Sequence, residues 1–290
     1  MTSREVVERH KSAGRYFDAG EIRSFVREDG DGEPVVLIHG VPSSSFLYRK
    51  VIDELAARGL RGIAFDLPGL GLADRPADFD YTWTGLGRFV REAVESLGLE
   101  RFHLVVHDIG GPAGLELAAA APERIRSLTV LNTIVEVDGF KRPWSMEPFA
   151  RRGIGEAYLA TLTKPAFWVL FNLQGVANRR AVPKEEVYAY VDLLKRDDGG
   201  RAFLKIMRGF ERTRENQDLY VGALRHVPYP VQVVWGAKDP ALPLETHGEA
   251  TRRAAGLDEI HALPAKHFLQ EDQAPAVAER VAALAALAAD

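Results

Sequence analysis

Asp108 is the residue whose surroundings point most directly to covalent chemistry. It follows an apolar run and precedes a Gly-Gly pair in the segment VVHDIGGPAG at residues 105–114. A sharp turn from a strand into a helix needs small neighbours and pushes its central side chain outward, and the helix N-terminus keeps a carboxylate ionised. An aspartate at this place predicts a nucleophile for an sp³ carbon, which displaces halide or opens an epoxide and leaves an alkyl ester. A helix cap is the alternative, but a cap alone does not account for the whole segment.

Two later residues complete a candidate set for nucleophilic catalysis. Asp239 and His267 each follow a predicted strand near the end of the chain. With Asp108 they occur in the order nucleophile, acid, histidine, which one large class of hydrolases uses. We expect His267 to be the general base for ester hydrolysis and Asp239 to orient its ring. Glu136 and Asp138 are rival acids that rank behind Asp239.

The segment HGVP at residues 39–42 is the fourth element of the candidate site. It ends an early predicted strand, so its backbone lies at the same sheet edge as Asp108. We predict that the N–H groups of Val41 and Ile109 form an oxyanion hole for the ester-hydrolysis step. His39 and Pro42 are assigned to the predicted substrate pocket. An ordinary turn after a strand is the alternative interpretation.

Alternating short apolar runs and longer helical periods predict the elements that position these residues. This alternation is typical of a mostly parallel sheet with helices on both faces. Strands are predicted at residues 34–38, 62–66, 102–106, 125–132, 231–235 and 259–263, and helices at 44–58, 84–97 and 274–289. Between 135 and 225 the strand signal disappears and several helices are predicted. We expect a core at 1–134 and 226–290, with a helical cap at 135–225 over the carboxyl ends of the strands.

Composition narrows the classes of function. The 290 residues carry a net charge of −4 and include no cysteine, which excludes disulfides and thiol catalysis. Basic residues are spread along the chain, so no nucleic-acid partner is expected. There is no apolar signal segment and no stretch long enough to cross a bilayer, so we expect a cytoplasmic protein without a membrane partner. No metal or cofactor is expected, because neither metal-ligand spacing nor a phosphate-binding glycine pattern occurs.

The chain resembles haloalkane dehalogenases and the related epoxide hydrolases of the α/β-hydrolase superfamily. The resemblance covers residues 34–132 and 231–288, and its motifs are HGVPSSSFLYR at 39–49, VHD at 106–108 and HFLQED at 267–272. Val106 points to the dehalogenases, because epoxide hydrolases usually carry glycine there. The resemblance implies an α/β-hydrolase fold with a helical cap. We expect a monomer or a homodimer.

Two positions depart from the dehalogenase pattern. Dehalogenases usually carry tryptophan directly after the nucleophile, where this chain has Ile109, and many carry Asn or Glu where it has Val41. Trp168 is a candidate replacement donor for the halide, although a tryptophan beside Phe167 is also typical of a core. We assign Trp168 and Phe167 to the predicted substrate pocket, since the apolar residues of the predicted cap favour a small hydrophobic organic substrate.

Three functions remain open at this point. The first is a dehalogenase-like hydrolase that forms an ester on Asp108. The second is an epoxide hydrolase that uses the same ester; such enzymes typically protonate the epoxide with two cap tyrosines, and this chain has Phe167 and Met207 near those positions. The third is a ligand-binding protein that keeps the fold, because fold does not fix function. The tyrosines left as candidates for the second function are Tyr158, Tyr188, Tyr190 and Tyr220.

Overall fold

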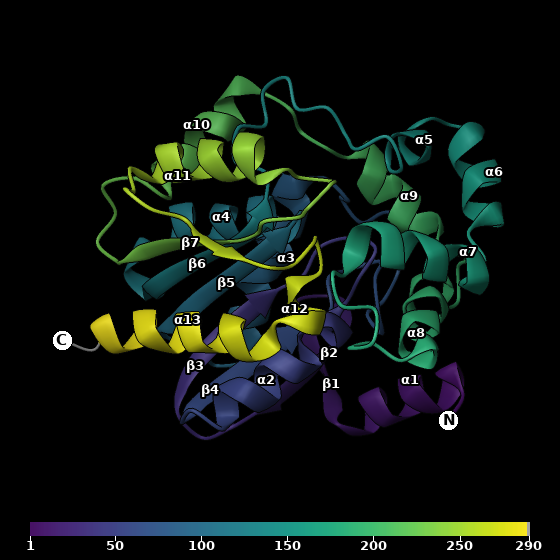
Figure 1. Cartoon of the computed structure of the whole chain (residues 1–290), viewed down its shortest axis with the longest axis horizontal. Helices are drawn as coiled ribbons and strands as arrows, with labels where there is room; N and C mark the ends of the chain where they lie inside the picture. Colours follow the sequence, from purple (N-terminus) through teal and green to yellow (C-terminus); the bar gives the residue numbers. More distant parts are fainter. Residues whose placement is uncertain (289–290) are drawn as a thin grey trace.

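An eight-stranded sheet lies at the centre of the computed structural model, which describes residues 1–288 (Figure 1). Residue 289 of the predicted final helix, and residue 290 of the predicted core, lie outside the described residues. The strand order is β1-β2-β4-β3-β5-β6-β7-β8. The strands are β1 (Gly14–Ala19), β2 (Ile22–Asp29), β3 (Glu33–Ile38), β4 (Leu60–Phe65), β5 (Phe102–Asp108), β6 (Ile125–Thr133), β7 (Val231–Gly236) and β8 (His261–Leu263).

Only the edge formed by β1, β2 and β4 is paired antiparallel, and all other neighbours are parallel. The predicted mostly parallel sheet is therefore confirmed, and its six predicted strands are β3 to β8. The hairpin of β1 and β2 was not predicted. In parallel pairs the carboxyl ends meet at one edge, which brings the ends of β3, β5, β7 and β8 together.

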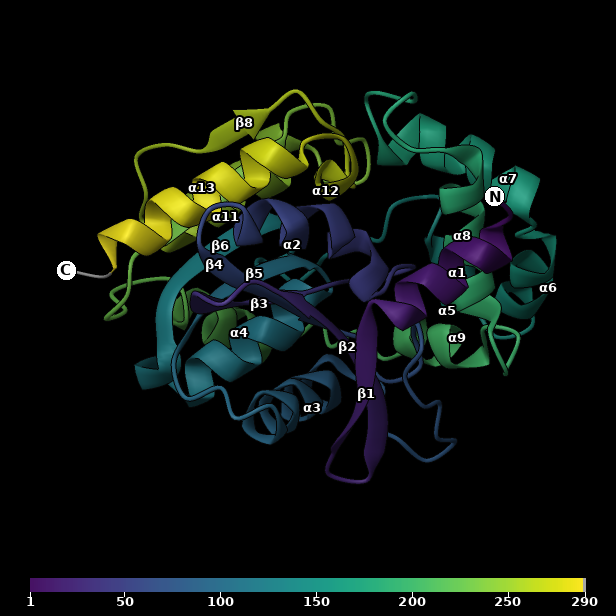
Figure 2. The same ribbon diagram turned by 90° about the horizontal axis from the view of Figure 1, so that it is seen from below.

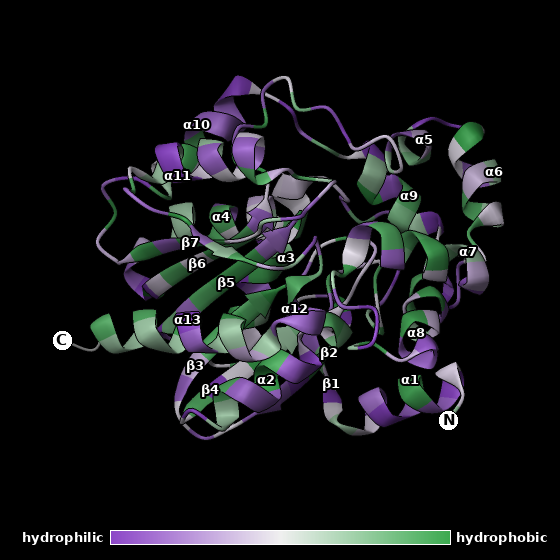
Figure 3. Ribbon diagram, viewed as in Figure 1, coloured by the Kyte–Doolittle hydropathy of each residue, from purple (hydrophilic) through white to green (hydrophobic). Residues whose placement is uncertain are grey.

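Helices cover both faces of the sheet. One face carries α3 (Trp83–Ser96) and α4 (Gly110–Ala120), and the other carries α2 (Arg49–Ala56) and α13 (Ala274–Leu287) (Figure 2). The alternation along β3 supports both layers, because Val35 packs in the cluster with α2 and α13 whereas Val36 packs in the opposite cluster. The central strands are accordingly the most hydrophobic part of the molecule in Figure 3.

A helical insertion, which we define as residues 147–208, separates β6 from β7 in the chain. It lies to one side of the sheet in Figure 1. Its elements are α5 (Glu147–Ala150), α6 (Ile154–Thr161), α7 (Lys164–Leu170), the π-helix η3 (Phe171–Gly175), α8 (Lys184–Lys195) and α9 (Arg201–Arg208). The next helix, α10 (Arg214–Gly222), instead packs against α4 of the sheet layer. The division into core and cap at 135 and 225 stays a prediction.

The remaining elements connect these layers. Helix α1 packs against α8 of the insertion (Figure 2), and a capping box between Thr2 and Glu5 starts it. The elements are α1 (Ser3–Ser12), η1 (Ser45–Tyr48), η2 (Pro122–Arg124), η4 (Leu244–Gly248), α11 (Glu249–Ala255) and α12 (Leu269–Asp272).

Candidate active site

Asp108 occupies a sharp turn between β5 and α4. Its backbone φ is +53°, in the left-handed region that non-glycine residues rarely adopt. A Cβ on Gly110 would lie 2.5 Å from the carbonyl oxygen of Ile38, and one on Gly111 would lie 1.8 Å from Thr133 Oγ1. The two glycines therefore allow α4 to begin directly against β3 and β6, and this close packing places the Asp108 side chain at the sheet edge.

The carboxylate of Asp108 is held in an ionised state by its neighbours. The backbone N–H of Val41 donates to Oδ1 at 2.7 Å. Burial alone would raise the pKa of Asp108, but the His267 ring and the backbone N–H of Ile109 outweigh it and lower that pKa. The N–H groups of Val41 and Ile109 thus face the same carboxylate, at the place where the sequence predicts an oxyanion hole.

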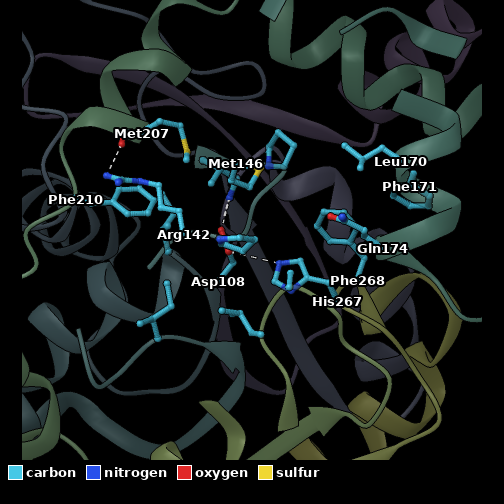
Figure 4. Close-up of a pocket in the computed structure, with 18 of the residues that line it drawn as sticks. Asp108, Arg142, Met146, Leu170, Phe171, Gln174, Met207, Phe210, His267 and Phe268 are labelled. Carbon is cyan, nitrogen blue, oxygen red and sulfur yellow. Dashed lines mark hydrogen bonds and ion pairs between the residues drawn. The ribbon is translucent and has the colours of Figure 1, made fainter. Parts of the chain in front are cut away.

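His267 lies between two carboxylates. Its Nδ1 is 2.8 Å from Asp239 Oδ2, and its Nε2 is 3.5 Å from Asp108 Oδ2 (Figure 4). All three side chains are buried or nearly so, although they come from the ends of β5, β7 and β8. The fold therefore brings together the three residues that the sequence assigns to catalysis.

Asp239 is fixed by donors that the sequence analysis missed. Asn132 Nδ2 donates to Asp239 Oδ2 at 2.6 Å, while the N–H groups of Ala241 and Leu242 donate to Oδ1 at 2.8 and 3.1 Å. Asn132 is itself held, because the N–H of Gly236 donates to its Oδ1 at 2.9 Å. A polar residue at the end of an apolar strand was the available signal for Asn132.

The rival acids lie elsewhere. Glu136 and Asp138 line a separate polar cavity at the surface, together with His247. The hydrogen bonds of the described residues give His267 Nδ1 one carboxylate partner, which is Asp239. The geometry therefore favours Asp239 as the acid paired with this histidine.

The charges around His267 favour its protonated form. Burial alone would lower the pKa of His267, but the carboxylates of Asp239 and Asp108 outweigh it and raise that pKa to about 10. Its neighbour His107 behaves oppositely: burial lowers the pKa of His107 to about 3, and its Nε2 lies 2.9 Å from the His267 carbonyl oxygen. His107 is therefore a neutral donor to the backbone that carries His267.

The raised pKa of His267 predicts a loss of stability in alkaline solution. Because the pKa of His267 is higher in the folded state than its unfolded value of 6.5, protonation of His267 stabilises the fold. This contribution is fully present below pH 6.5 and is lost as the pH rises through about 10. We expect the melting temperature of the wild-type protein to fall over this range relative to that of His267→Gln. Parallel thermal melts of both proteins across the range measure the difference, and a constant difference would contradict the raised pKa.

A pocket opens next to these groups, between the sheet edge and the helical insertion (Figure 4). It encloses about 80 Å³ and is lined mostly by apolar side chains. Pro42 and Phe167, two of the predicted pocket residues, are part of its lining. The lining residues are Val41, Pro42, Asp108, Ile109, Ile134, Phe140, Arg142, Pro143, Met146, Phe167, Leu170, Phe171, Gln174, Gly175, Met207, Phe210, Ala241, Leu242, His267 and Phe268.

His39 and Trp168 do not line this pocket, which corrects their assignment. The ring of His39 is fully buried: its Nδ1 lies 2.9 Å from the Gly40 carbonyl oxygen, and its Nε2 accepts from the N–H of Leu67 at 3.0 Å. His39 thus joins two loops. Trp168 is 36% exposed on the outer face of α7, one residue from Phe167. Phe167 is buried and lines the pocket, whereas Trp168 is absent from the lining.

None of the four candidate tyrosines belongs to the lining of this pocket. Tyr190 and Tyr220 are fully buried, and their hydroxyls contact Glu271 and Asn216 respectively. The side chains of Tyr158 and Tyr188 also lie outside the lining. Apart from His267, the aromatic residues that line the pocket are phenylalanines, which carry no proton to donate.

Two polar residues on the pocket wall were missed by the sequence analysis. Arg142 lies in the loop between β6 and α5, and Gln174 lies in η3. Figure 4 places them on opposite sides of Asp108 and His267. The hydroxyl of Ser145 lies 2.9 Å from Gln174 Oε1 and can donate to it, which leaves the amide N–H groups available to a ligand. Neither position carries a motif, so the sequence offered no signal beyond residue type.

The loop that carries His267 is hydrogen bonded along its length to the insertion. Lys266 Nζ donates to the carbonyl oxygens of Asn172 and Leu173 at 3.0 and 2.7 Å. The N–H of His267 lies 3.4 Å from the Gln174 carbonyl oxygen. The N–H of Phe268 donates to the Gly175 carbonyl oxygen at 2.8 Å. The position of the histidine backbone therefore depends on η3.

Two further properties bear on partners. Across residues 1–288, no group of three or more His, Asp or Glu side chains has the geometry to hold a metal ion. In the same part of the chain, no helix is both long enough and apolar enough to span a membrane.

Comparisons with known proteins agree with this architecture. The model of the alpha/beta hydrolase fold family matches residues 33–274. A haloalkane dehalogenase of Mycobacterium marinum is 33% identical over 283 residues, which cover 91% of this chain and 89% of the relative.

Two solved structures have the same fold. The haloalkane dehalogenase DbeA from Bradyrhizobium elkani superposes with a TM-score of 0.76 at 22% identity, covering 95% of this chain and 98% of the other. An epoxide hydrolase from Vigna radiata gives 0.73 at 22% identity, covering 92% and 96%. At these identities the structural likeness establishes the fold alone. Together with the family match and the Mycobacterium marinum relative, it means that the chain belongs to the alpha/beta hydrolase fold family and is homologous to haloalkane dehalogenases.

Proposed function

We propose that the protein is a hydrolase that displaces halide from an sp³ carbon with the carboxylate of Asp108 and then hydrolyses the resulting ester. One observation carries this proposal. The ionised Asp108 carboxylate faces a mostly apolar pocket and accepts a hydrogen bond from the N–H of Val41. It lies 3.5 Å from Nε2 of His267, and the opposite ring nitrogen of His267 pairs with Asp239.

In the first step an oxygen of Asp108 attacks the carbon that bears the halogen. The new C–O bond forms as the carbon–halogen bond breaks, and the halide leaves with the bonding pair. The apolar wall excludes water and keeps the carboxylate reactive. Gln174 is the neutral donor on the lining, and we assign its amide N–H groups to the departing halide.

The second step requires His267 to change its protonation state. When Asp108 becomes a neutral ester, one of the two charges that raise the pKa of His267 disappears, which lowers that pKa and allows the ring to release its proton. The neutral ring then takes a proton from water, and the hydroxide attacks Cγ of the ester. The N–H groups of Val41 and Ile109 stabilise the oxyanion, and collapse releases the alcohol. The balance is RX + H₂O → ROH + H⁺ + X⁻.

Epoxide hydrolysis is the second candidate, through the same ester. Ring opening produces an alkoxide on the substrate, and this oxygen needs a proton donor on the side away from Asp108. The lining carries no tyrosine, and the side chains of Gln174 and Arg142 donate hydrogen bonds but do not readily give up a proton. Halide displacement needs no such donor, which is why we place dehalogenation first. A purely ligand-binding role comes last, because it does not need the paired arrangement of Asp108, His267 and Asp239.

The test is the intact mass of His267→Gln after exposure to a panel of bromoalkanes and epoxides. Removing the base blocks ester hydrolysis but leaves the initial attack possible, so we expect an alkyl adduct that maps to Asp108. A hydroxyalkyl adduct on the same residue would instead support epoxide opening.

The matched control is the double variant Asp108→Asn with His267→Gln, which differs from the tested variant by one nearly isosteric substitution and removes the nucleophile. An adduct that persists in the double variant would place the covalent chemistry on another residue. No adduct from any compound, in a variant with a normal melting curve, would reject both enzyme hypotheses.

A further inference from the structure

Arg142 places a buried cation on the wall of the candidate active site. Its side chain is 6% exposed and lines the same pocket as Asp108 and His267 (Figure 4). These three are the charged groups of the lining. Asp239 pairs with His267 at 2.8 Å from behind the lining, so the Arg142 guanidinium is the one cation of the three that has no carboxylate within hydrogen-bond distance.

The guanidinium is held in one orientation. Its Nη2 donates to the Met207 carbonyl oxygen at 2.8 Å, and its Cζ lies 4.4 Å from the centroid of the Phe210 ring. Both of these partners also line the pocket. The planar fork is therefore pre-organised, and a ligand that binds it spends little conformational entropy of the side chain.

The charge of Arg142 is only partly compensated by the protein. Its nearest carboxylate is that of Glu147, with 3.7 Å between Nη1 and Oε2, and Glu147 is 41% exposed. The Nε–H group is shielded from solvent and has no acceptor among the described residues. Burial first, and the charge of Arg212 second, lower the pKa of Arg142. A buried cation in this condition is costly unless an anion pairs with it.

We propose that Arg142 is a carboxylate-binding subsite, so that the preferred substrates are short halogenated carboxylic acids. The planar fork matches a planar carboxylate through two parallel hydrogen bonds, whereas a halide is a sphere that needs no fork. The pocket volume of about 80 Å³ favours a short chain. This inference rests on the proposed function and names its substrate class.

The carboxylate is not consumed in the reaction. Asp108 forms a bond to the carbon that bears the halogen, the halide leaves with its electron pair, and water hydrolyses the ester with the help of His267. The balance is X–R–COO⁻ + H₂O → HO–R–COO⁻ + H⁺ + X⁻. The product is a hydroxy acid, and the carboxylate stays on Arg142 until release.

The test compares bromide release from bromopropanoate and from bromopropane, with blanks that contain no enzyme. We expect kcat/KM of the wild-type protein to favour the acid by about tenfold or more, since a charge-assisted pair contributes roughly 1.5–3 kcal/mol. In Arg142→Gln the preference should disappear, mainly through the KM of the acid. Arg142→Lys, which keeps the charge without the fork, should restore part of it.

Arg214→Gln is the control for a change in net charge, because Arg214 is 71% exposed, pairs with Asp218 and lies outside the pocket lining. It should keep the full preference. Calorimetric binding of propanoate to the wild-type protein provides a second measurement in case Arg142→Gln does not fold, and propanoate that does not bind would overturn the subsite.

The outcomes separate the two proposals. Bromide release from bromopropane with no preference for the acid overturns the carboxylate subsite and leaves the proposed function intact. If Arg142→Gln impairs both substrates equally through kcat, the anion at Arg142 is the departing halide, which also overturns the subsite. Release from neither substrate, together with no adduct on His267→Gln, rejects the proposed function itself.

Discussion

Asp108→Asn is expected to lower halide release on the order of 10⁴-fold or more, which is the scale of losing a covalent nucleophile. The amide has nearly the same shape, and the N–H of Val41 can still donate to its oxygen. The loss would therefore reflect nucleophilicity rather than a distorted turn. Initial-rate measurements of bromide release from a bromoalkane test this, and activity near the wild-type level would remove Asp108 from the mechanism.

The same variant has a second readout that does not depend on turnover. Because Asp108 is one of two carboxylates that raise the pKa of His267, its neutralisation should lower that pKa while Asp239 still supports it. Titration of the imidazole by NMR measures the shift. Asp138→Asn is the matched control: it removes a rival acid outside the pocket lining and should change neither the rate nor the titration.

Glu271→Gln is expected to cost about 3–5 kcal/mol of unfolding free energy, as does removing one partner from a buried ion pair. The Glu271 side chain is fully buried and accepts from Nη1 and Nη2 of Arg49 at 2.6 and 2.9 Å. Tyr190 donates to the same carboxylate at 2.5 Å, and Lys50 Nζ lies 3.0 Å from it. Without the negative charge, Arg49 remains a buried cation with Glu186 as its other acidic partner.

Chemical denaturation of both proteins measures this cost. The control is Asp218→Asn, which breaks the pair between Arg214 and Asp218, whose side chains are 71% and 63% exposed. Exposed pairs of this kind contribute roughly 0.3–0.5 kcal/mol, so the control should unfold almost like the wild-type protein. Equal losses in the two variants would show that the buried network contributes no more than a surface pair.

The sheet could be predicted from the sequence because its strands are short, apolar and separated by clear turns. The β-branched and leucine runs of β3, β5 and β7 are long enough to bury both faces, and this pattern has few other solutions. The edge hairpin of β1 and β2 was missed, since its strands mix charged and apolar residues, as solvent-facing antiparallel strands do. The candidate triad was placed together by the same logic, because three parallel strands end at one edge.

The pocket walls could not be derived in this way. Phe167 and Trp168 are neighbours in a short helix with apolar residues on all sides, so periodicity does not decide which one faces the pocket. His39 lies in a motif, but its ring is directed into the protein by Leu67 in another loop. Arg142 is positioned by the Met207 carbonyl, 65 residues away in the chain. Such placements depend on tertiary contacts, which local sequence does not encode.

The hydrogen bonds between residues 266–268 and η3 restrict how this protein can be recombined with its relatives. In a chimera that exchanges residues 147–208 alone, the carbonyl groups that accept hydrogen bonds from residues 266–268 would come from another protein. The backbone of His267, and with it the ring, would then be positioned by contacts that were not selected together with this loop. The unit of exchange is therefore discontinuous in the chain. Crossover points should be chosen so that η3 and the segment from Lys266 to Asp272 come from the same parent.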